Sequence, residues 1–352
     1  MKDYLSKKYA SLAPYVPGEQ PTDRRYIKLN TNESPFPPCP GVIAAAEREA
    51  GLLNLYPDPD NKALTETVAA SLGVKPSQVL MTAGSDEILN YAFMAFCDSD
   101  TPAFFADITY GFYEVFANVN GVPFETVPLK DDFTIDTADY LGGGKTVFIA
   151  NPNAPTGIFL PLAEIEKIAA ANRDNVVVID EAYIDFGGQS AVSLLGKYDN
   201  LLITRTFSKS RSLAGARLGM GIGSEGIIQA LNTVKYSVNP YNVNRMTGAA
   251  GIEAIKDTAY TEQCLTKVIE NREWTAAKLG ELGYTVLPSL TNFIFAKHPS
   301  LSGEEVYLRL KKAGILVRHF TKPRIADYNR ITIGSKEQMQ ALIAELSKEE
   351  MK

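Results

Sequence analysis

Short apolar runs alternate with amphipathic stretches through the first two thirds of the chain. The runs at 146–150, 176–180 and 201–205 are nearly continuous and rich in β-branched residues, which predicts strands buried on both faces. A run at 102–105 predicts another strand. Elsewhere apolar positions recur at helical spacing, and we expect helices near 61–72, 84–97, 111–118 and 162–171. This alternation predicts an α/β fold whose mostly parallel sheet carries helices on both faces.

The two ends of the chain follow different patterns. The first 40 residues contain seven prolines, so they cannot form a regular helix, and we expect an arm that wraps over the surface. After a mainly helical stretch at 240–282, shorter strands and helices return, which predicts a smaller α+β domain. These strands are expected at 285–287, 293–296, 315–318 and 330–333, with helices near 303–313 and 336–348. We therefore predict an arm with part of the small domain at 1–45, a large domain with the connecting helix at 46–282, and a small domain at 283–352.

Composition limits the kinds of partner. There are 35 Lys and Arg against 41 Asp and Glu, a net charge of −6, and no dense basic tract, which argues against a nucleic-acid surface. Three scattered cysteines and two histidines give no disulfide framework and no Cys- or His-rich metal site. The amino terminus lacks the apolar core of a secretory signal, and no stretch approaches the roughly 18 apolar residues of a membrane span. We expect a cytoplasmic protein that acts on small molecules.

Two glycine motifs resemble nucleotide-binding sequences without their context. Gly144-Lys145-Thr146 matches the end of a phosphate-binding P-loop, but the pattern needs a glycine at Asp139 and a helix where 147–149 is a predicted strand. The segment 221–226 fits the dinucleotide fingerprint, but no acidic residue follows about 20 positions later to hold a ribose. We interpret the first as a loop and the second as a strand-to-helix turn.

Three polar segments each follow a predicted strand, where an open α/β sheet places its ligand crevice. They are 151–157 (Asn-Pro-Asn-Ala-Pro-Thr-Gly), 180–183 (Asp-Glu-Ala-Tyr) and 206–209 (Thr-Phe-Ser-Lys) with Arg217 beyond. A lysine beside a buried crevice can act as a nucleophilic amine, so Lys209 is a candidate for a Schiff base. An acid that faces a heteroaromatic nitrogen keeps it protonated and makes the ring an electron sink, and Asp180 fits this role.

The remaining polar residues suit the rest of the same ligand. Tyr183 and Asn153 can hydrogen-bond a ring hydroxyl, and Tyr110 can stack on the ring face. Thr206, Ser208 and Arg217 can bind a phosphate together with Ser85 and Asp86, which begin a predicted helix whose free N–H groups attract anions. The ligand that this set predicts is pyridoxal phosphate.

Together, these residues resemble those of the fold type I pyridoxal-phosphate aminotransferases, and within them the histidinol-phosphate aminotransferase family. The resemblance spans nearly the whole chain and is specific through the order and spacing of its parts. They are Pro14-Tyr15, the segment 29–35, Tyr56-Pro57, Gly84-Ser85-Asp86-Glu87, Thr109-Tyr110, the three segments above, Val317-Arg318 and the segment 330–334. The chain departs from the family at Thr82-Ala83, where Gly-Asn is frequent, and at Ile108, where Pro is frequent.

The resemblance implies a role for each matching residue. Lys209 would carry pyridoxal phosphate and move the proton between substrate and cofactor, with Asp180 and Tyr183 as the other catalytic residues. The cofactor-binding set would be Tyr56, Ser85, Asp86, Tyr110, Asn153, Asp180, Tyr183, Thr206, Ser208, Lys209 and Arg217. Substrate contacts would come from Tyr15, Asn32, Arg318 and Arg330. Because Tyr56 of this family reaches the cofactor of the other subunit, the resemblance also implies a homodimer with shared active sites.

The implied reaction interconverts L-histidinol phosphate and 2-oxoglutarate with imidazole-acetol phosphate and L-glutamate, in histidine biosynthesis. Two other enzymes of similar type stay open, an aromatic-amino-acid aminotransferase and a decarboxylase resembling those that act on threonine phosphate. A non-catalytic transcription regulator would need a DNA-binding module before the fold, and the resemblance begins at Pro14. We therefore expect an enzyme. His319, next to Arg318, receives no role.

Overall fold

A seven-stranded sheet forms the centre of the computed structural model, which describes residues 4–10, 12, 15 and 17–349. Its strand order is β2-β8-β7-β6-β5-β3-β4. The strands are β2 (Val79–Thr82), β3 (Ala103–Ala106), β4 (Phe124–Val127), β5 (Thr146–Ala150), β6 (Val177–Asp180), β7 (Leu201–Thr206) and β8 (Gly219–Gly223). Only β8 runs antiparallel to its two neighbours, and all other adjacent pairs are parallel. The predicted α/β fold with a mostly parallel sheet is confirmed.

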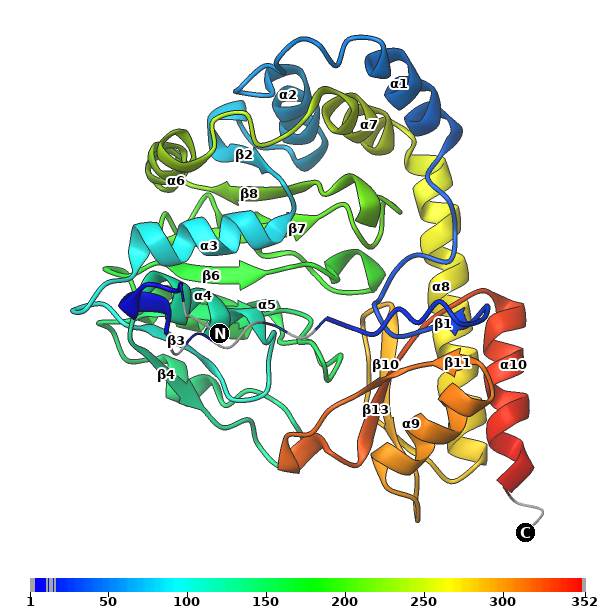
Figure 1. The fold of residues 1–352 in the computed structure, drawn as a ribbon. Helices are drawn as coiled ribbons and strands as arrows, with labels where there is room; N and C mark the ends of the chain where they lie inside the picture. The colour runs from blue at the N-terminus through cyan, green and yellow to red at the C-terminus, as the bar shows by residue number, and fades with distance from the viewer. Residues whose placement is uncertain (1–3, 11, 13–14, 16, 350–352) are drawn as a thin grey trace.

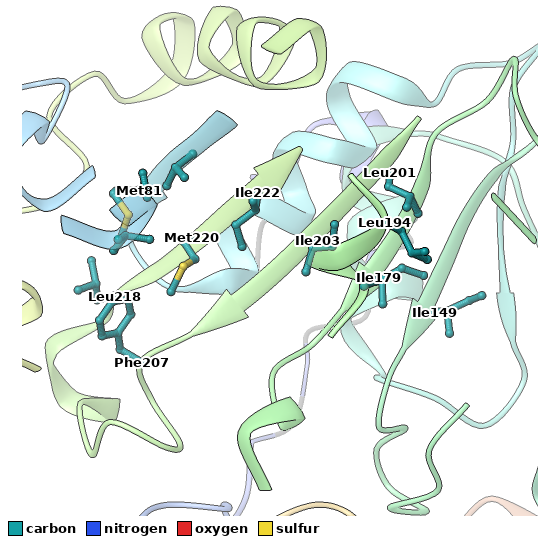
Figure 2. Close-up of a cluster of buried hydrophobic side chains, with 14 of the residues drawn as sticks. Met81, Ile149, Ile179, Leu194, Leu201, Ile203, Phe207, Leu218, Met220 and Ile222 are labelled. Carbon is teal, nitrogen blue, oxygen red and sulfur yellow. The ribbon is translucent and has the colours of Figure 1, made fainter. Parts of the chain in front are cut away.

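Helices cover both faces of this sheet, as the alternation predicts. They are α1 (Pro40–Ala50), α2 (Lys62–Leu72), α3 (Ser85–Phe96), α4 (Phe112–Asn120), α5 (Leu162–Ala171), α6 (Glu225–Val238) and α7 (Arg245–Lys256). Successive residues of β6 point to opposite faces: Val177 and Ile179 pack with α2, α5 and α7, and Val178 packs with α3, α4 and α6. Figure 2 shows part of the cluster of buried side chains to which Val177 and Ile179 belong, with Ile179 between Ile149 and Ile203. Burial on both faces explains why these strands are continuous apolar runs.

A second, antiparallel sheet of order β12-β13-β10-β9 lies beside the first (Figure 1). It consists of β9 (Thr285–Val286), β10 (Phe293–Lys297), β12 (Arg318–His319) and β13 (Tyr328–Thr332), accompanied by α9 (Gly303–Lys312) and α10 (Lys336–Leu346). The arm joins it through β1 (Ile27–Lys28), which pairs in parallel with β11 (Ile315–Leu316). The helix α8 (Thr258–Glu281) runs from the side of α1 and α7 to this sheet and contributes Val268 and Leu279 to its core. The domain boundaries themselves stay a prediction.

Several predicted elements differ in the structure. The mainly helical stretch at 240–282 is two helices, α7 and α8, because Asp257 ends one and caps the next with its side chain. The predicted strand at 315–318 is divided between β11, which pairs with the arm, and β12, which pairs with β13. The helix α1 and the strands β1, β2 and β4 were not predicted. In β4 the two central residues are exposed, so this edge strand lacks the apolar run that marks its neighbours.

Short 3₁₀ turns complete the chain at Lys7–Tyr9, Pro76–Gln78, Thr137–Tyr140, Ile184–Phe186, Ala191–Leu194, Ala214–Ala216, Pro323–Ile325 and Ser347–Glu349. The glycines at 142–144 form a loop before β5, and Gly221–Gly223 end a strand before α6, as predicted. Pro14, where the resemblance begins, lies outside the described residues. Among those that are described, no helix is both long and apolar enough to span a bilayer.

Candidate active site

The last residues of β5, β6 and β7 meet at a cavity of about 280 Å³. Parallel strands place their carboxyl ends at one edge of the sheet, which brings together segments far apart in the sequence. Most of the predicted cofactor-binding residues line this cavity: Ser85, Asp86, Tyr110, Asp180, Tyr183, Thr206, Ser208, Lys209 and Arg217. Thr31, Glu33, Ala150, Pro152, Ala154, Ala182 and Ala214 complete the lining.

Asp180 ends β6 and is almost fully buried. Burial raises the pKa of its carboxyl from 3.8 to about 6, and the nearby Asp86 carboxylate adds to this increase. Three donors oppose it: Oδ1 accepts from the Ala182 N–H and the Thr204 hydroxyl, and Oδ2 accepts from the Tyr113 hydroxyl, each at 3.2 Å. The carboxylate is therefore held in a fixed orientation, and none of these three donors is a cation.

Lys209 lies on the other side of the cavity, just after β7. Burial and the Arg330 guanidinium lower the pKa of its amine from 10.5 to about 8. Its Nζ donates a hydrogen bond to the Thr31 carbonyl at 3.3 Å and lies 5.9 Å from the centre of the Tyr183 ring. Both causes that can make a lysine nucleophilic, loss of water and a neighbouring cation, are present here.

The start of α3 forms one corner of the cavity. Ser85 and Asp86 occupy its first turn, and Gly84 precedes them with a φ of 88°. A Cβ on Gly84 would lie 2.8 Å from Arg217 Nη2, and one on Gly219 of β8 would lie 2.3 Å from the Gly84 carbonyl carbon and the Ser85 nitrogen. Both positions thus require glycine so that the helix start, β8 and Arg217 can approach each other.

Arg217 adopts a left-handed backbone conformation with a φ of 53°, which is costly for a residue with a side chain. The guanidinium reaches Ser208 Oγ at 3.4 Å and Asp86 Oδ2 at 3.4 Å, and the Thr206 hydroxyl donates to Ser208 Oγ at 2.9 Å. Hydroxyl groups, a guanidinium and free helix N–H groups therefore converge at one end of the cavity, which is the donor set that a phosphate requires.

Two tyrosines flank the space between Asp180 and Lys209. The Tyr110 hydroxyl donates to Asp86 Oδ1 at 2.7 Å, which fixes its ring at the cavity wall. Burial raises the pKa of Tyr183, and Arg330 opposes this increase. The Tyr183 hydroxyl accepts from Asn32 Nδ2 at 2.9 Å. Burial also raises the pKa of Tyr110, so both phenols stay protonated near neutral pH. The Tyr110 proton already bonds Asp86, whereas the Tyr183 hydroxyl, which accepts from Asn32, can donate to a ligand.

Asn32 and Asn153 lie behind the cavity wall and are not among its lining residues. Asn32 is buried with a φ of 56°, and its side chain bonds Tyr183 and the Thr332 hydroxyl. The Asn153 amide donates to the Ile108 carbonyl and to the Thr156 hydroxyl, each at 3.0 Å, and its oxygen accepts from Thr109. It lines a neighbouring cavity instead, while Ala154 lines this one. Their predicted contacts with substrate and cofactor stay predictions.

Arg318 and Arg330 are directly opposite each other on the antiparallel pair β12–β13. Arg330 Nη2 donates to the Asn30 carbonyl at 3.1 Å, while its Nε is buried without a hydrogen-bond partner among the described residues. A buried guanidinium nitrogen without an acceptor is costly, and a second guanidinium across the strand increases the positive potential. Neither arginine is among the residues that line the cavity, and their predicted contacts with the substrate stay predictions.

The two remaining predicted residues are more exposed. Tyr15 packs its ring against Phe112 at the start of α4, with centroids 4.3 Å apart, so the arm crosses from the small sheet to the large one. Tyr56 is 79% exposed and stacks on Tyr241 at 4.6 Å. Neither lines the cavity as the structure describes it.

The sequence analysis missed residues that act on the site from outside its motifs. Asp180 accepts hydrogen bonds from Tyr113 and Thr204, and Lys209 donates one to the Thr31 carbonyl. Gly219 has no side chain, so the start of α3 can approach β8 closely. Tyr113 follows Tyr110 by one helical turn, which was a signal for a second residue on the same helix face. The others depend on strand register, which no local pattern of the chain reveals.

Known proteins share this fold. A family model described as aminotransferase class I and II matches residues 24–346, and the chain belongs to this family. The match covers both sheets and all the residues that line the cavity.

Two relatives and one solved structure show which members of this family the chain resembles. The histidinol-phosphate aminotransferase of Brachyspira hyodysenteriae is 50% identical over 348 residues, which are 98% of each chain. That of Clostridium botulinum (strain Kyoto) is 45% identical over 349 residues, 99% of each chain. The crystal structure of the Sinorhizobium meliloti histidinol-phosphate aminotransferase, in complex with pyridoxal-5′-phosphate, superposes with a TM-score of 0.89 at 26% identity, covering 99% of this chain and 98% of the other. The predicted resemblance to histidinol-phosphate aminotransferases is confirmed.

Proposed function

We propose that this chain is a pyridoxal-phosphate-dependent aminotransferase that interconverts L-histidinol phosphate and 2-oxoglutarate with imidazole-acetol phosphate and L-glutamate, in histidine biosynthesis. One observation carries the proposal: a single cavity holds a buried carboxylate, a lysine with a lowered pKa and an anion-binding helix start. The names of the relatives supply histidinol phosphate as a substrate, and the other reactants follow from the family resemblance.

The residues present fit the cofactor. Asp180, which lacks a cation, would pair with the ring nitrogen, and Tyr183 would donate to the ring oxygen. Ser85, Ser208 and Arg217 would hold the phosphate. When bound, pyridoxal phosphate supplies an aldehyde that combines with amines and a protonated ring that withdraws electrons from the bond being broken.

The work of the chain is to hold and move protons around that ring. With a pKa of about 8, roughly a tenth of Lys209 amines are neutral at pH 7 and able to attack a carbonyl carbon. With cofactor and substrate bound, Lys209 Nζ would take the proton from the substrate α-carbon. The Thr31 carbonyl, which accepts from Nζ, would help to orient it. Asp180 would keep the ring nitrogen protonated, and Tyr110, whose hydroxyl is held by Asp86, would cover the ring face.

One binding site must accept two different anions, the phosphate of histidinol phosphate and the carboxylate of glutamate. Arg318 and Arg330 support this proposal because a planar guanidinium matches both groups. The buried Nε of Arg330, which has no acceptor among the described residues, gains a partner when either anion binds.

We further propose a homodimer with active sites at the interface. Large apolar side chains around Tyr56 are exposed in the single chain: Leu52, Leu53, Leu55, Tyr236, Val238 and Tyr241. The Tyr56–Tyr241 stack joins the segment after α1 to the segment after α6, so these side chains belong to one surface. An apolar surface of this kind is typical of a protein interface. A second copy would cover it and bring Tyr56 to the cofactor phosphate of its partner. Three unpaired, buried cysteines support a reducing, cytoplasmic location.

The test combines cofactor mapping with substrate comparison. Borohydride reduction of the purified protein, followed by peptide mass mapping, should place the cofactor on Lys209, and Lys209→Ala should be folded but inactive. A label on another lysine, or turnover by Lys209→Ala, would contradict the assignment. Histidinol phosphate should convert the bound cofactor to its amine form faster than phenylalanine does. Conversion by phenylalanine alone would indicate an aromatic aminotransferase, and release of carbon dioxide from threonine phosphate a decarboxylase.

A further inference from the structure

Asp180 receives a hydrogen bond from a tyrosine that belongs to none of the motifs. Tyr113 of α4 is fully buried, and its hydroxyl donates to Asp180 Oδ2 at 3.2 Å. Its ring packs edge-on against Tyr110, with centroids 5.7 Å apart at 87°, and against Phe105. Tyr113 thus contacts both the carboxylate and the predicted stacking residue.

The distribution of donors over the carboxylate selects one oxygen for the ligand. An ionised carboxylate has about two acceptor positions on each oxygen. The Ala182 N–H and the Thr204 hydroxyl use those of Oδ1, while Tyr113 alone donates to Oδ2 within the described chain. One position on Oδ2 is left for a further donor.

We propose that Tyr113 is a positioning residue that holds Asp180 ionised and presents Oδ2 to the cofactor ring nitrogen, with Thr204 supporting the same carboxylate from Oδ1. This inference rests on the proposed function. The proton between a ring nitrogen and a carboxylate stays on the nitrogen when the carboxylate is the weaker base. Donors to the carboxylate make it a weaker base, so Tyr113 and Thr204 keep the ring protonated.

The surroundings of Asp180 make these two hydroxyls important. Burial and the Asp86 carboxylate both favour the protonated form of Asp180, and Tyr110 and Tyr183, which also line the cavity, are neutral. Burial likewise raises the pKa of Tyr113 well above its usual value, so Tyr113 remains a donor at all working pH values. Without its hydroxyl, the proton shifts from the ring nitrogen toward Asp180.

The test uses Tyr113→Phe, which keeps the ring packing and removes the hydroxyl, and Thr204→Val, which does the same at Oδ1. The matched control is Tyr140→Phe, because Tyr140 is also buried and its hydroxyl has no partner in the described chain. The holoenzyme is loaded with cofactor that carries ¹⁵N in its ring, and the ¹⁵N resonance reports whether the nitrogen is protonated.

For Tyr113→Phe we expect the ¹⁵N signal to move toward the unprotonated position and kcat to fall about tenfold, with KM little changed. Thr204→Val should change the ¹⁵N signal and kcat in the same direction, and Tyr140→Phe should change neither the signal nor kcat. Normal ¹⁵N signals and kcat in Tyr113→Phe and Thr204→Val would overturn the inference, even if both variants are less stable. If Tyr113→Phe does not fold, Thr204→Val decides alone. A wild-type protein that takes up no pyridoxal phosphate would instead refute the proposed function.

Discussion

Replacing Asp180 by asparagine separates what its charge costs the fold from what it contributes to catalysis. Asp180 is buried, and the pKa of its carboxyl rises from 3.8 to about 6 in the folded protein. A difference of about 2 pKa units corresponds to about 3 kcal/mol. Because the folded pKa is the higher one, folding takes up a proton between these values. The apoprotein is therefore most stable below about pH 4 with respect to this group, and it loses about 3 kcal/mol as the pH rises through about 6.

Asparagine can keep the contacts of Asp180 without the charge. Its oxygen can accept from the Ala182 N–H and the Thr204 hydroxyl, and its amide can donate to the Tyr113 hydroxyl oxygen. Asp180→Asn should thus resemble the protonated acid at every pH. We expect the variant apoprotein to be more stable than the wild type by up to about 3 kcal/mol above about pH 7, with the gain disappearing near about pH 4.

Urea denaturation of the two apoproteins near these pH values measures the difference. Asp131→Asn, which removes the same charge from an exposed site, is the control and should give no pH-dependent gain. The reasoning is refuted if Asp180→Asn is less stable than the wild type at both pH values, or if its gain is the same at both. In the holoenzyme the substitution should be harmful, because asparagine cannot hold the ring nitrogen protonated. We expect transamination to fall about 100-fold or more.

Three further predictions address the phosphate corner, the dimer and the substrate anion. Gly219→Ala should weaken pyridoxal-phosphate binding about tenfold or more in a cofactor titration, since its Cβ would meet the α3 start at 2.3 Å, whereas Gly226→Ala, with open space around it, should bind normally. Lys209→Ala and Tyr56→Ala should each be inactive alone, but mixed subunits should recover up to about a quarter of wild-type activity, because a mixed dimer contains one intact site. If the mixed subunits recover no activity, the active sites are not shared between subunits. Arg330→Met should lower kcat/KM about 100-fold for both histidinol phosphate and glutamate while cofactor content stays normal, and an effect on one substrate alone would contradict the shared anion site.

The sequence predicts the main sheet well because burial on both faces leaves a strong local signal. Each of the strands β5, β6 and β7 is a continuous apolar run that ends in or before a polar motif, so Asp180 and Lys209 could be assigned to one sheet edge. The exposed edge strand β4 has no such run, and three of the five residues of β8 are glycine. Their positions depend on pairing with distant strands rather than on local pattern.

Which neighbouring residue faces the cavity could not be predicted in the same way. The segment 151–157 follows β5 as a turn and not as a strand, so its motif locates a site but not the side that each residue faces. Ala154 lines the cavity, while Asn153 joins the segments at Ile108 and Thr156, and its predicted contact with the ring stays a prediction. Tyr113 was missed for a related reason, since its contact with Asp180 depends on how α4 packs on β6.

The electrostatics of Asp180 and Lys209 link folding to cofactor binding. Two buried groups of opposite charge usually reduce each other's cost by pairing. In the described part of the chain no hydrogen bond or ion pair joins these two: Lys209 bonds the Thr31 carbonyl, and Asp180 accepts from Tyr113, Thr204 and Ala182. The pKa of each group is therefore displaced toward its neutral form.

A ligand with a basic nitrogen at one end and a carbonyl carbon at the other relieves both costs at once, because Asp180 gains a cation and Lys209 reacts as the neutral amine that burial already favours. The protein should consequently gain more stability from the whole cofactor than from phosphate, which occupies only the corner at Arg217. It follows that Asp180→Asn should be the more stable protein without cofactor and should gain less from binding it. The buried Asp180 carboxylate should thus lower the stability of the apoprotein and strengthen its binding of the ring.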